Sequence, residues 1–151
     1  MDCLIRIATN GDAAAISQVV VRSLRESNAQ DYSPEIIDQV EQSFSPTAIL
    51  HLLIQRQVFV ATIDDHVVAT ASLDRDIARS VFVDPASQGA GIGRQLMAMI
   101  QSIAVNKGVK LLRVPSSITA EGFYSALGFK KFRDEFHGAE RTIIMEKSLD
   151  Q

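Results

Sequence analysis

The sequence of 151 residues has little of several features that mark particular protein classes. Its one cysteine, Cys3, excludes an internal disulfide and a thiolate metal site, and its 3 histidines lack metal-ligand spacing. No apolar run approaches the ~20 residues of a membrane span, and residues 1–6 do not resemble a signal peptide. We therefore expect no metal, no membrane partner and a cytoplasmic protein.

Basic clusters are also missing. The 15 Lys and Arg residues are outnumbered by 18 Asp and Glu residues, and no basic run is interleaved with aromatic residues, so nucleic acid is not an expected partner. Trp is absent, so the 46% of hydrophobic residues must build a mainly aliphatic core. Their number suits one ordinary domain, and without a repeat or linker we expect that domain to span residues 1–151.

The N-terminal third has mainly helical patterns. Ile5 and Ile7 alternate with polar neighbours as in a short strand. After them, the apolar spacing and the prolines predict a helix over about residues 12–28, a second from Pro34 that Pro46 closes, and a short third over 47–54.

From residue 57 onward the pattern is typical of strands and helices in alternation. Val, Thr and Ile dominate residues 57–73, and Asp64-Asp65 breaks the run, which predicts a β-hairpin. The further predicted elements are a strand over 77–83, a helix that ends at Gly108, a strand over 109–114 that Pro115 ends, a helix from about Thr119 to Gly128, and two strands joined around His137-Gly138. The predicted class is mixed α/β, with a parallel pair of strands around the second-last helix.

A glycine-rich loop, "SQGAGIGRQL" over residues 87–96, precedes that helix. The first backbone N–H groups of a helix lack intrahelical partners and carry a partial positive charge, so glycines there can open an anion site. A tight turn that happens to use glycine is the alternative. Three glycines, Gly89, Gly91 and Gly93, favour the anion site, because Gly93 stands inside the first helical turn at a cost of up to ~1 kcal/mol.

The residues around the loop do not match either of two known nucleotide-binding motifs. A dinucleotide fingerprint needs G-x-G-x-x-G and an acidic residue after the next strand, but position 94 is Arg and that strand ends in "VPSS". A phosphate loop of the Walker type needs Gly-Lys-Ser/Thr, which is missing here.

The segment "VFVDPASQGAGIGRQLM" (81–97) resembles the acyl-CoA-binding motif of the GCN5-related N-acetyltransferases, through Gln88, Gly91 and Gly93. A second segment, "SSITAEGFYSALGF" (116–129), is similar to the Tyr-x-x-x-Gly-Phe segment of that family. The ending "MEKSL" (145–149) resembles a common terminal strand of these enzymes. The resemblance covers nearly the whole chain.

The resemblance implies a mixed sheet whose two middle parallel strands splay apart around acetyl-CoA. The loop amides would then hold the pyrophosphate, and the backbone near Phe82 and Val83 would pair with the pantetheine arm. A serine stands where the family often has an Asn that contacts this arm. The implied cofactor-binding residues are Phe82, Val83, Gln88, Gly89, Ala90, Gly91, Ile92, Gly93, Arg94 and Ser117.

The chemistry implied is transfer of an acetyl group to a primary amine by direct attack in a ternary complex. Tyr124 matches the general acid of the family, and its ordinary pKa near 10 keeps it protonated at neutral pH. The alternative is a Tyr packed between helix and sheet with a locally satisfied hydroxyl. Asp76 is our candidate base, with Asp74, Glu121 and His137 as alternatives.

The acceptor is not encoded in any pattern we recognise; a small amine and a peptide amine both fit the family. Homodimers are common among its members, although no interface signal is visible in this sequence. Two other functions stay open: an acyl-CoA sensor or interaction module without turnover, and a general phosphate-ligand domain. Competition between ATP and acetyl-CoA distinguishes the last from the others.

Overall fold

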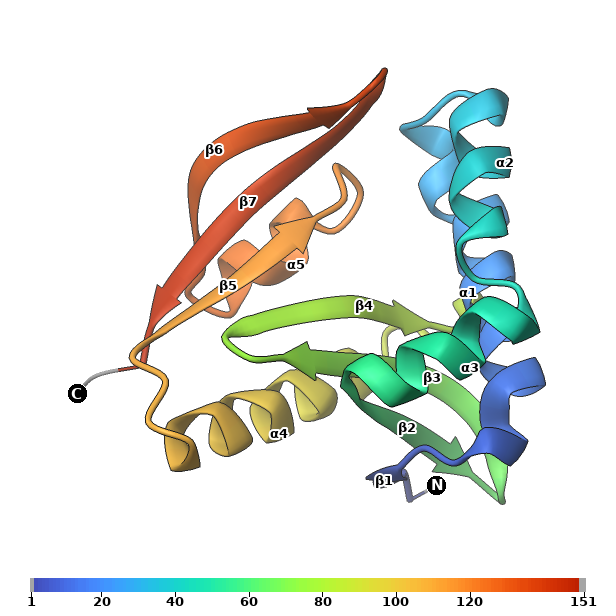
Figure 1. Cartoon of the computed structure of the whole chain (residues 1–151), viewed down its shortest axis with the longest axis horizontal. Helices are drawn as coiled ribbons and strands as arrows, with labels where there is room; N and C mark the ends of the chain where they lie inside the picture. Colours follow the sequence, from blue (N-terminus) through green and yellow to red (C-terminus); the bar gives the residue numbers. More distant parts are fainter. Residues whose placement is uncertain (1, 150–151) are drawn as a thin grey trace.

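A seven-stranded mixed sheet organises the computed structural model, which describes residues 2–149 (Figure 1). The strand order is β1-β2-β3-β4-β5-β7-β6, and every neighbouring pair is antiparallel except β4 and β5. Residues 1, 150 and 151 of the expected domain lie outside the described residues. The strands are β1 (Leu4–Ile7), β2 (Gln57–Ile63), β3 (His66–Asp74), β4 (Ile77–Val83), β5 (Leu111–Ser116), β6 (Lys130–His137) and β7 (Glu140–Ser148).

Helices cover both faces of this sheet because its central strands are apolar on both sides. Val58 and Val60 of β2 pack with the first three helices, whereas the alternate residues Phe59 and Ala61 pack with the fourth. The mixed α/β class predicted from the sequence is confirmed. The helices are α1 (Ala13–Glu26), α2 (Pro34–Gln42), α3 (Pro46–Gln55), α4 (Ile92–Asn106) and α5 (Glu121–Ala126).

The parallel strands β4 and β5 touch at one end and then diverge, as Figure 1 shows. A single register pair, Ile77 with Arg113, joins them, and the Arg113 N–H donates to the Asp76 carbonyl at 3.0 Å. Beyond this point each strand pairs on its other side, β4 with β3 and β5 with β7. The expected splay of the two middle parallel strands is therefore present.

The prediction that Pro115 ends its strand is wrong, since β5 continues to Ser116. Backbone N–H groups two residues apart in a strand point to the same side, so the nitrogen of Pro115 faces β4, as that of Arg113 does. At Pro115 the neighbouring strand has already moved away, and the missing N–H costs no ladder hydrogen bond.

A β-bulge interrupts β4 at Ser80, which has a left-handed φ of 54°. Phe82 pairs with Thr70 of β3, whereas Arg79 pairs with Ser72, so β4 carries one extra residue between these pairs. The bulge lies in the part of β4 that has separated from β5, and it includes Ser80 and the following Val81.

Other predicted boundaries were confirmed or corrected at particular residues. Asp64 and Asp65 form the β2–β3 turn with φ of 51° and 64°, which confirms the hairpin. Pro46 does not close the second helix, which ends at Gln42; it opens α3 instead, behind Ser45, whose hydroxyl caps the helix. Proline suits this first helical position because its missing N–H would have no partner there.

A charged cluster fastens the entrance of α1 to β1. The Arg6 guanidinium donates to both carboxylate oxygens of Asp12 at 2.8 and 2.9 Å, and the Thr9 N–H donates to the same carboxylate at 2.7 Å. Asp12 is buried, and these donors lower the pKa of its carboxyl to about 2, with the Arg6 hydrogen bond as the largest cause.

We expect Asp12→Asn to lower the free energy of unfolding at pH 7 by about 2 kcal/mol, because the ionised carboxylate stabilises the fold. This contribution is complete above the unfolded pKa near 4 and is lost as the pH falls through about 2. Urea unfolding at pH 7, 4 and 2.5 measures it. Asp38→Asn on the exposed side of α2 is the control, and an equal loss in both variants would contradict the assignment.

Candidate active site

Two pockets meet where β4 and β5 diverge. One has a volume of about 440 Å³ and lies against the glycine loop and the start of α4; the other, of about 430 Å³, lies between α2, β4 and the β6–β7 hairpin. Molecules bound in the two pockets could therefore touch. The residues that line both are Asn28, Val81, Phe82, Ser117, Ala120 and Tyr124.

We name the first the loop pocket and the second the hairpin pocket. In the loop pocket, Gly89 and Gly91 have left-handed φ values of 86° and 80°, and Gly91 caps the N-terminus of α4. A Cβ added at either residue would meet no protein atom within 4 Å. Their left-handed conformation favours glycine, and the open space beside them leaves the loop backbone accessible from the pocket.

Gly93 has a different reason to be glycine. Its Cβ would lie 3.1 Å from Cζ of Phe123 and 3.5 Å from Cγ2 of Val83, so the residue lets α4 approach α5 and β4 closely. Gly93 is therefore explained by packing and not, as expected from the sequence, by an anion site. Its backbone still lines the loop pocket beside Ile92, which is also buried in the core.

The remaining predicted loop residues have distinct surroundings. The Gln88 side chain turns back, and its Nε2 donates to the Val83 carbonyl at 3.2 Å and to the Ser27 hydroxyl at 3.3 Å. Arg94 is exposed, lines the pocket and has no carboxylate partner within residues 2–149. Ala90 is exposed and does not line the pocket.

Phe82 and Val83 lie on β4 beside the gap, and both line the loop pocket. They pair with Thr70 and Ala69 of β3, while no register pair joins this part of β4 to β5. Backbone groups on that side are consequently available to a bound molecule. The Val83 carbonyl already accepts from Gln88, so a ligand group there would replace or share that bond.

Tyr124 stands at the junction of the two pockets. Its side chain is buried edge-on between Phe123 and Phe129, with ring centroids 5.1 and 5.7 Å away. Burial raises the pKa of the Tyr124 phenol well above its usual value, so the group stays protonated. Its hydroxyl makes no hydrogen bond to another residue in 2–149. A locally satisfied hydroxyl, the alternative raised from the sequence, is therefore not what the structure shows.

Ser117 lines both pockets, and its hydroxyl accepts a hydrogen bond from the Ala120 N–H at 3.1 Å. The donor capacity of this hydroxyl is free for a ligand. Asn28 and Ser27, at the end of α1, also line the loop pocket but were not identified from the sequence. The small polar residues Ser23 and Ser27, spaced four apart, are the signal that could have indicated this face.

The candidate bases lie in different places. Asp76 is exposed in the β3–β4 turn, lines neither pocket, and is about 16 Å along the strand from Val81. Asp74 pairs with Arg75 and Arg79, each at 3.5 Å, and Glu121 lines neither pocket. His137 alone among the four lines the hairpin pocket.

The hairpin pocket contains polar residues that sequence patterns did not identify. The Tyr32 hydroxyl donates to the Arg141 carbonyl at 2.7 Å and accepts from the Ile118 N–H at 2.8 Å, tying β7 to the segment after β5. Arg56 and Glu140 line the same pocket. Tyr32 lies 86 and 109 positions from its two hydrogen-bond partners, so no local spacing could have revealed this contact.

Residues 2–149 contain neither a candidate membrane span nor a candidate metal site. No helix there is long and apolar enough to cross a membrane, and no group of three or more His, Cys, Asp or Glu side chains is placed to hold a metal ion.

The fold and the paired pockets define a mixed α/β protein with an open site between splayed parallel strands. A family model described as acetyltransferase (GNAT) domain matches residues 28–149. The chain belongs to this family, as the motifs around Gly91 and Tyr124 indicated.

Solved structures agree with this assignment of the fold. The GCN5-related N-acetyltransferase from Rhodopseudomonas palustris is 23% identical, with a TM-score of 0.93 over 98% of this chain and 96% of that one. PaiA N-acetyltransferase from Thermoplasma acidophilum, in complex with coenzyme A, is 22% identical, with a TM-score of 0.83 over 98% and 99% of the two chains. YncA from Salmonella typhimurium, with its cofactor acetyl-CoA, is 22% identical, with a TM-score of 0.68 over 99% and 95%.

The contrasting bonds of two tyrosines give a stability prediction. Tyr32→Phe should lower the free energy of unfolding by about 1–2 kcal/mol, because it leaves the Ile118 N–H and the Arg141 carbonyl without their partner. Tyr124→Phe is the matched control and should change it by less than about 0.5 kcal/mol, since no bond within the chain is lost. Urea unfolding compares the two, and equal losses would refute the described hydroxyl environments.

Proposed function

We propose that the protein is an acetyl-CoA-dependent N-acetyltransferase that moves an acetyl group to a primary amine in a ternary complex. The observation that carries the proposal is the position of Tyr124. Its protonated hydroxyl, free of bonds within the described chain, lies where the loop pocket meets the hairpin pocket. A donor at the junction of two sites suits a reaction between two bound molecules.

The loop pocket has the features that a pyrophosphate and its attached arm require. The free N–H groups at the start of α4, next to Gly89 and Gly91, favour a phosphate, and Arg94 adds an uncommitted positive charge. The backbone of Phe82 and Val83 is available to the amide groups of a pantetheine arm, and Ser117 offers a hydroxyl. Relatives of the same fold with coenzyme A or acetyl-CoA support this assignment.

Acetyl-CoA would supply an activated thioester carbonyl to an amine held in the hairpin pocket. The neutral amine nitrogen would form a bond to this carbonyl carbon, the carbon–sulfur bond would break, and the departing sulfur would take a proton from the Tyr124 hydroxyl. The nitrogen would release one proton to a base or to water, and the Tyr124 phenolate would regain one from water, so that the products are an N-acetylated amine and a free thiol. Tyr124 suits its part because burial among aromatic rings keeps its hydroxyl protonated.

The role of Asp76 as the general base remains a prediction from the sequence. This residue lines neither pocket. Among the sequence candidates, His137 has the better position because it lines the hairpin pocket, where Glu135 and Glu140 also lie. These carboxylates would also attract a cationic amine before it loses its proton.

A non-catalytic acyl-CoA sensor is the second candidate function, since the loop pocket would serve binding alone equally well. The position of Tyr124 favours the enzyme, because a proton donor at the junction of two pockets serves a reaction between two bound molecules and is not needed for binding alone.

We expect Gly91→Ala to weaken acetyl-CoA binding at least about tenfold, as measured by calorimetry. Alanine at a left-handed φ costs ~1–2 kcal/mol per residue, and escape from this conformation would turn the loop amides away from the ligand. Gly108→Ala at the other end of α4 is the matched control. It has a φ of 83° and an equally open environment, so it should lose similar stability and keep full affinity.

ATP serves as the control ligand in the same titrations. Binding of ATP as tightly as acetyl-CoA would support a general phosphate-ligand domain instead, and no binding of either would remove the proposed function. Equal loss of affinity in the Gly91 and Gly108 variants would show that the loop is structural.

Tyr124→Phe should lower kcat by about 100-fold or more and leave the acetyl-CoA affinity unchanged, because it removes the proton donor without changing the pocket shape. Thiol release with a panel of primary amines measures kcat. In the unchanged protein the rate should also hold as the pH rises through 10, since the raised pKa keeps Tyr124 protonated. Full activity of the variant would exclude this role for Tyr124.

A further inference from the structure

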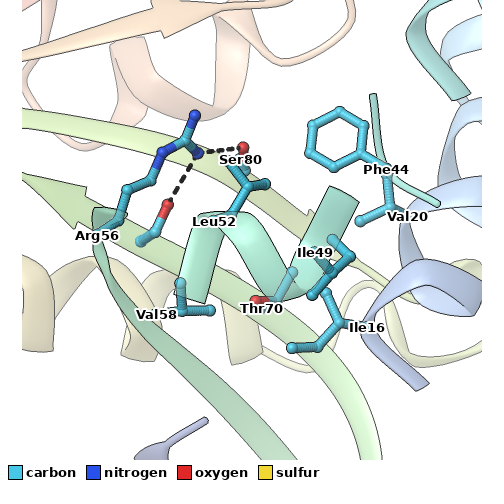
Figure 2. Close-up of a pocket in the computed structure, with 10 residues that line it drawn as sticks. Ile16, Val20, Phe44, Ile49, Leu52, Arg56, Val58, Thr70 and Ser80 are labelled. Carbon is cyan, nitrogen blue, oxygen red and sulfur yellow. Dashed lines mark hydrogen bonds between the residues drawn. The ribbon is translucent and has the colours of Figure 1, made fainter. Parts of the chain in front are cut away.

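Arg56 occupies an unusual place between α3 and β2. Arg56 lines a small apolar cavity of about 10 Å³, which is too small for an organic ligand. Figure 2 shows its guanidinium turned toward Ser80. One terminal nitrogen donates to the Ser80 hydroxyl at 3.0 Å and to the Ser72 hydroxyl at 3.4 Å. The other two guanidinium nitrogens have no hydrogen-bond partner within residues 2–149, and Arg56 lines the hairpin pocket.

The pairing of the arginines sets Arg56 apart. Eight of them have a carboxylate oxygen within 4.0 Å inside the described part of the chain, namely Arg6, Arg22, Arg25, Arg75, Arg79, Arg113, Arg133 and Arg141. Arg56 and Arg94 have none. Arg94 lines the loop pocket, where we propose that phosphates bind, and Arg56 lines the hairpin pocket, where the acceptor would bind.

The surroundings of Arg56 are unfavourable for an unpaired cation. The side chain is half-buried, and the pKa of its guanidinium is lowered, first by this burial and then by the positive charge of Arg79. Two neutral serine hydroxyls supply its hydrogen bonds. A half-buried charge is stable when an anion pairs with it, and a planar guanidinium with two free nitrogens matches the two oxygens of a carboxylate.

The site lies next to the proposed reaction centre. Arg56 bonds to Ser80 in the β4 bulge, and the next residue, Val81, lines both pockets. Arg56 and Tyr124 line the same pocket, so an anion held by Arg56 would share that pocket with the proposed proton donor. A small acceptor that carries both a carboxylate and an amine fits such an arrangement.

We propose that Arg56 binds the carboxylate of the acceptor and that the acceptor is an amine of the amino-acid class. This inference rests on the proposed function. The hairpin pocket is lined by Arg56 and Arg79 and by Glu135 and Glu140. Arg79 pairs with Asp74 and Glu135 with Arg133, which leaves one cation, Arg56, and one carboxylate, Glu140, without an ion-pair partner within residues 2–149. Such a pocket suits a molecule with one amine and one carboxylate better than a polyamine or a phosphate dianion.

The test compares acceptors that differ in the carboxylate alone. Leucine, methionine, phenylalanine and lysine are each paired with their carboxamides, and kcat/KM is measured by thiol release at one pH. We expect the ratio of acid to amide to fall about 10- to 100-fold in Arg56→Gln, with the amides unaffected. The amine pKa differs between an amino acid and its carboxamide. This difference affects the parent protein and Arg56→Gln equally, so it cancels when their acid-to-amide ratios are compared. Arg94→Gln is the control; it should raise the KM for acetyl-CoA and leave the ratio unchanged.

A second measurement uses the unchanged protein, so it tests the proposal even if the Arg56→Gln variant does not fold. With coenzyme A present, the N-acetylated acids should bind at least about tenfold more tightly than the N-acetylated amides by calorimetry. Equal binding, or acid-to-amide ratios that do not differ between the parent protein and Arg56→Gln, would overturn the inference. Acetylation of amines without any carboxylate preference would overturn it and leave the proposed function standing, whereas failure to bind acetyl-CoA would remove both.

Discussion

The divergence of β4 from β5 is the constraint on which the rest of the site depends. One register pair, Ile77 with Arg113, holds the parallel strands together, and each strand then satisfies its outer edge with another neighbour. The inner edges beyond this pair have no partner strand. Backbone groups without partners are costly in a dry core, so the gap must stay open to water or to a ligand. The two pockets follow directly from this geometry.

The bulge at Ser80 adds a second consequence. An extra residue on β4 turns the strand at the place where the gap opens, and its left-handed φ requires support from surrounding side chains. The Arg56 guanidinium donates to the Ser80 hydroxyl in this bulge. The bulge thus brings one nitrogen of Arg56 to β4, while the free nitrogens of the same guanidinium are the ones proposed to recognise the acceptor.

Sequence patterns predicted what depends on neighbouring residues and missed what depends on distant ones. The paired Asp64 and Asp65 indicated their turn, and the loop glycines indicated an open helix N-terminus, because backbone conformation there is set locally. Pro115 misled the prediction of β5, since proline ends a strand where a partner needs its N–H and is harmless beside a gap. Arg56 and Tyr32 could not be identified, because their partners, Ser80 in β4 and Ile118 after β5, come from other parts of the chain.

The burial of Tyr124 explains how a six-residue helix can hold the proposed proton donor in place. A helix this short has little stability of its own, so its orientation depends on packing. Phe123 and Phe129 pack against the Tyr124 ring, and Gly93 lets α4 approach Phe123 closely. Phe123 thus contacts both Gly93 of α4, which follows the glycine loop, and the Tyr124 ring. A shift of α4 that opened the loop would also move Tyr124, so a proposed cofactor site and a proposed proton donor are coupled through Gly93 rather than through any polar bond.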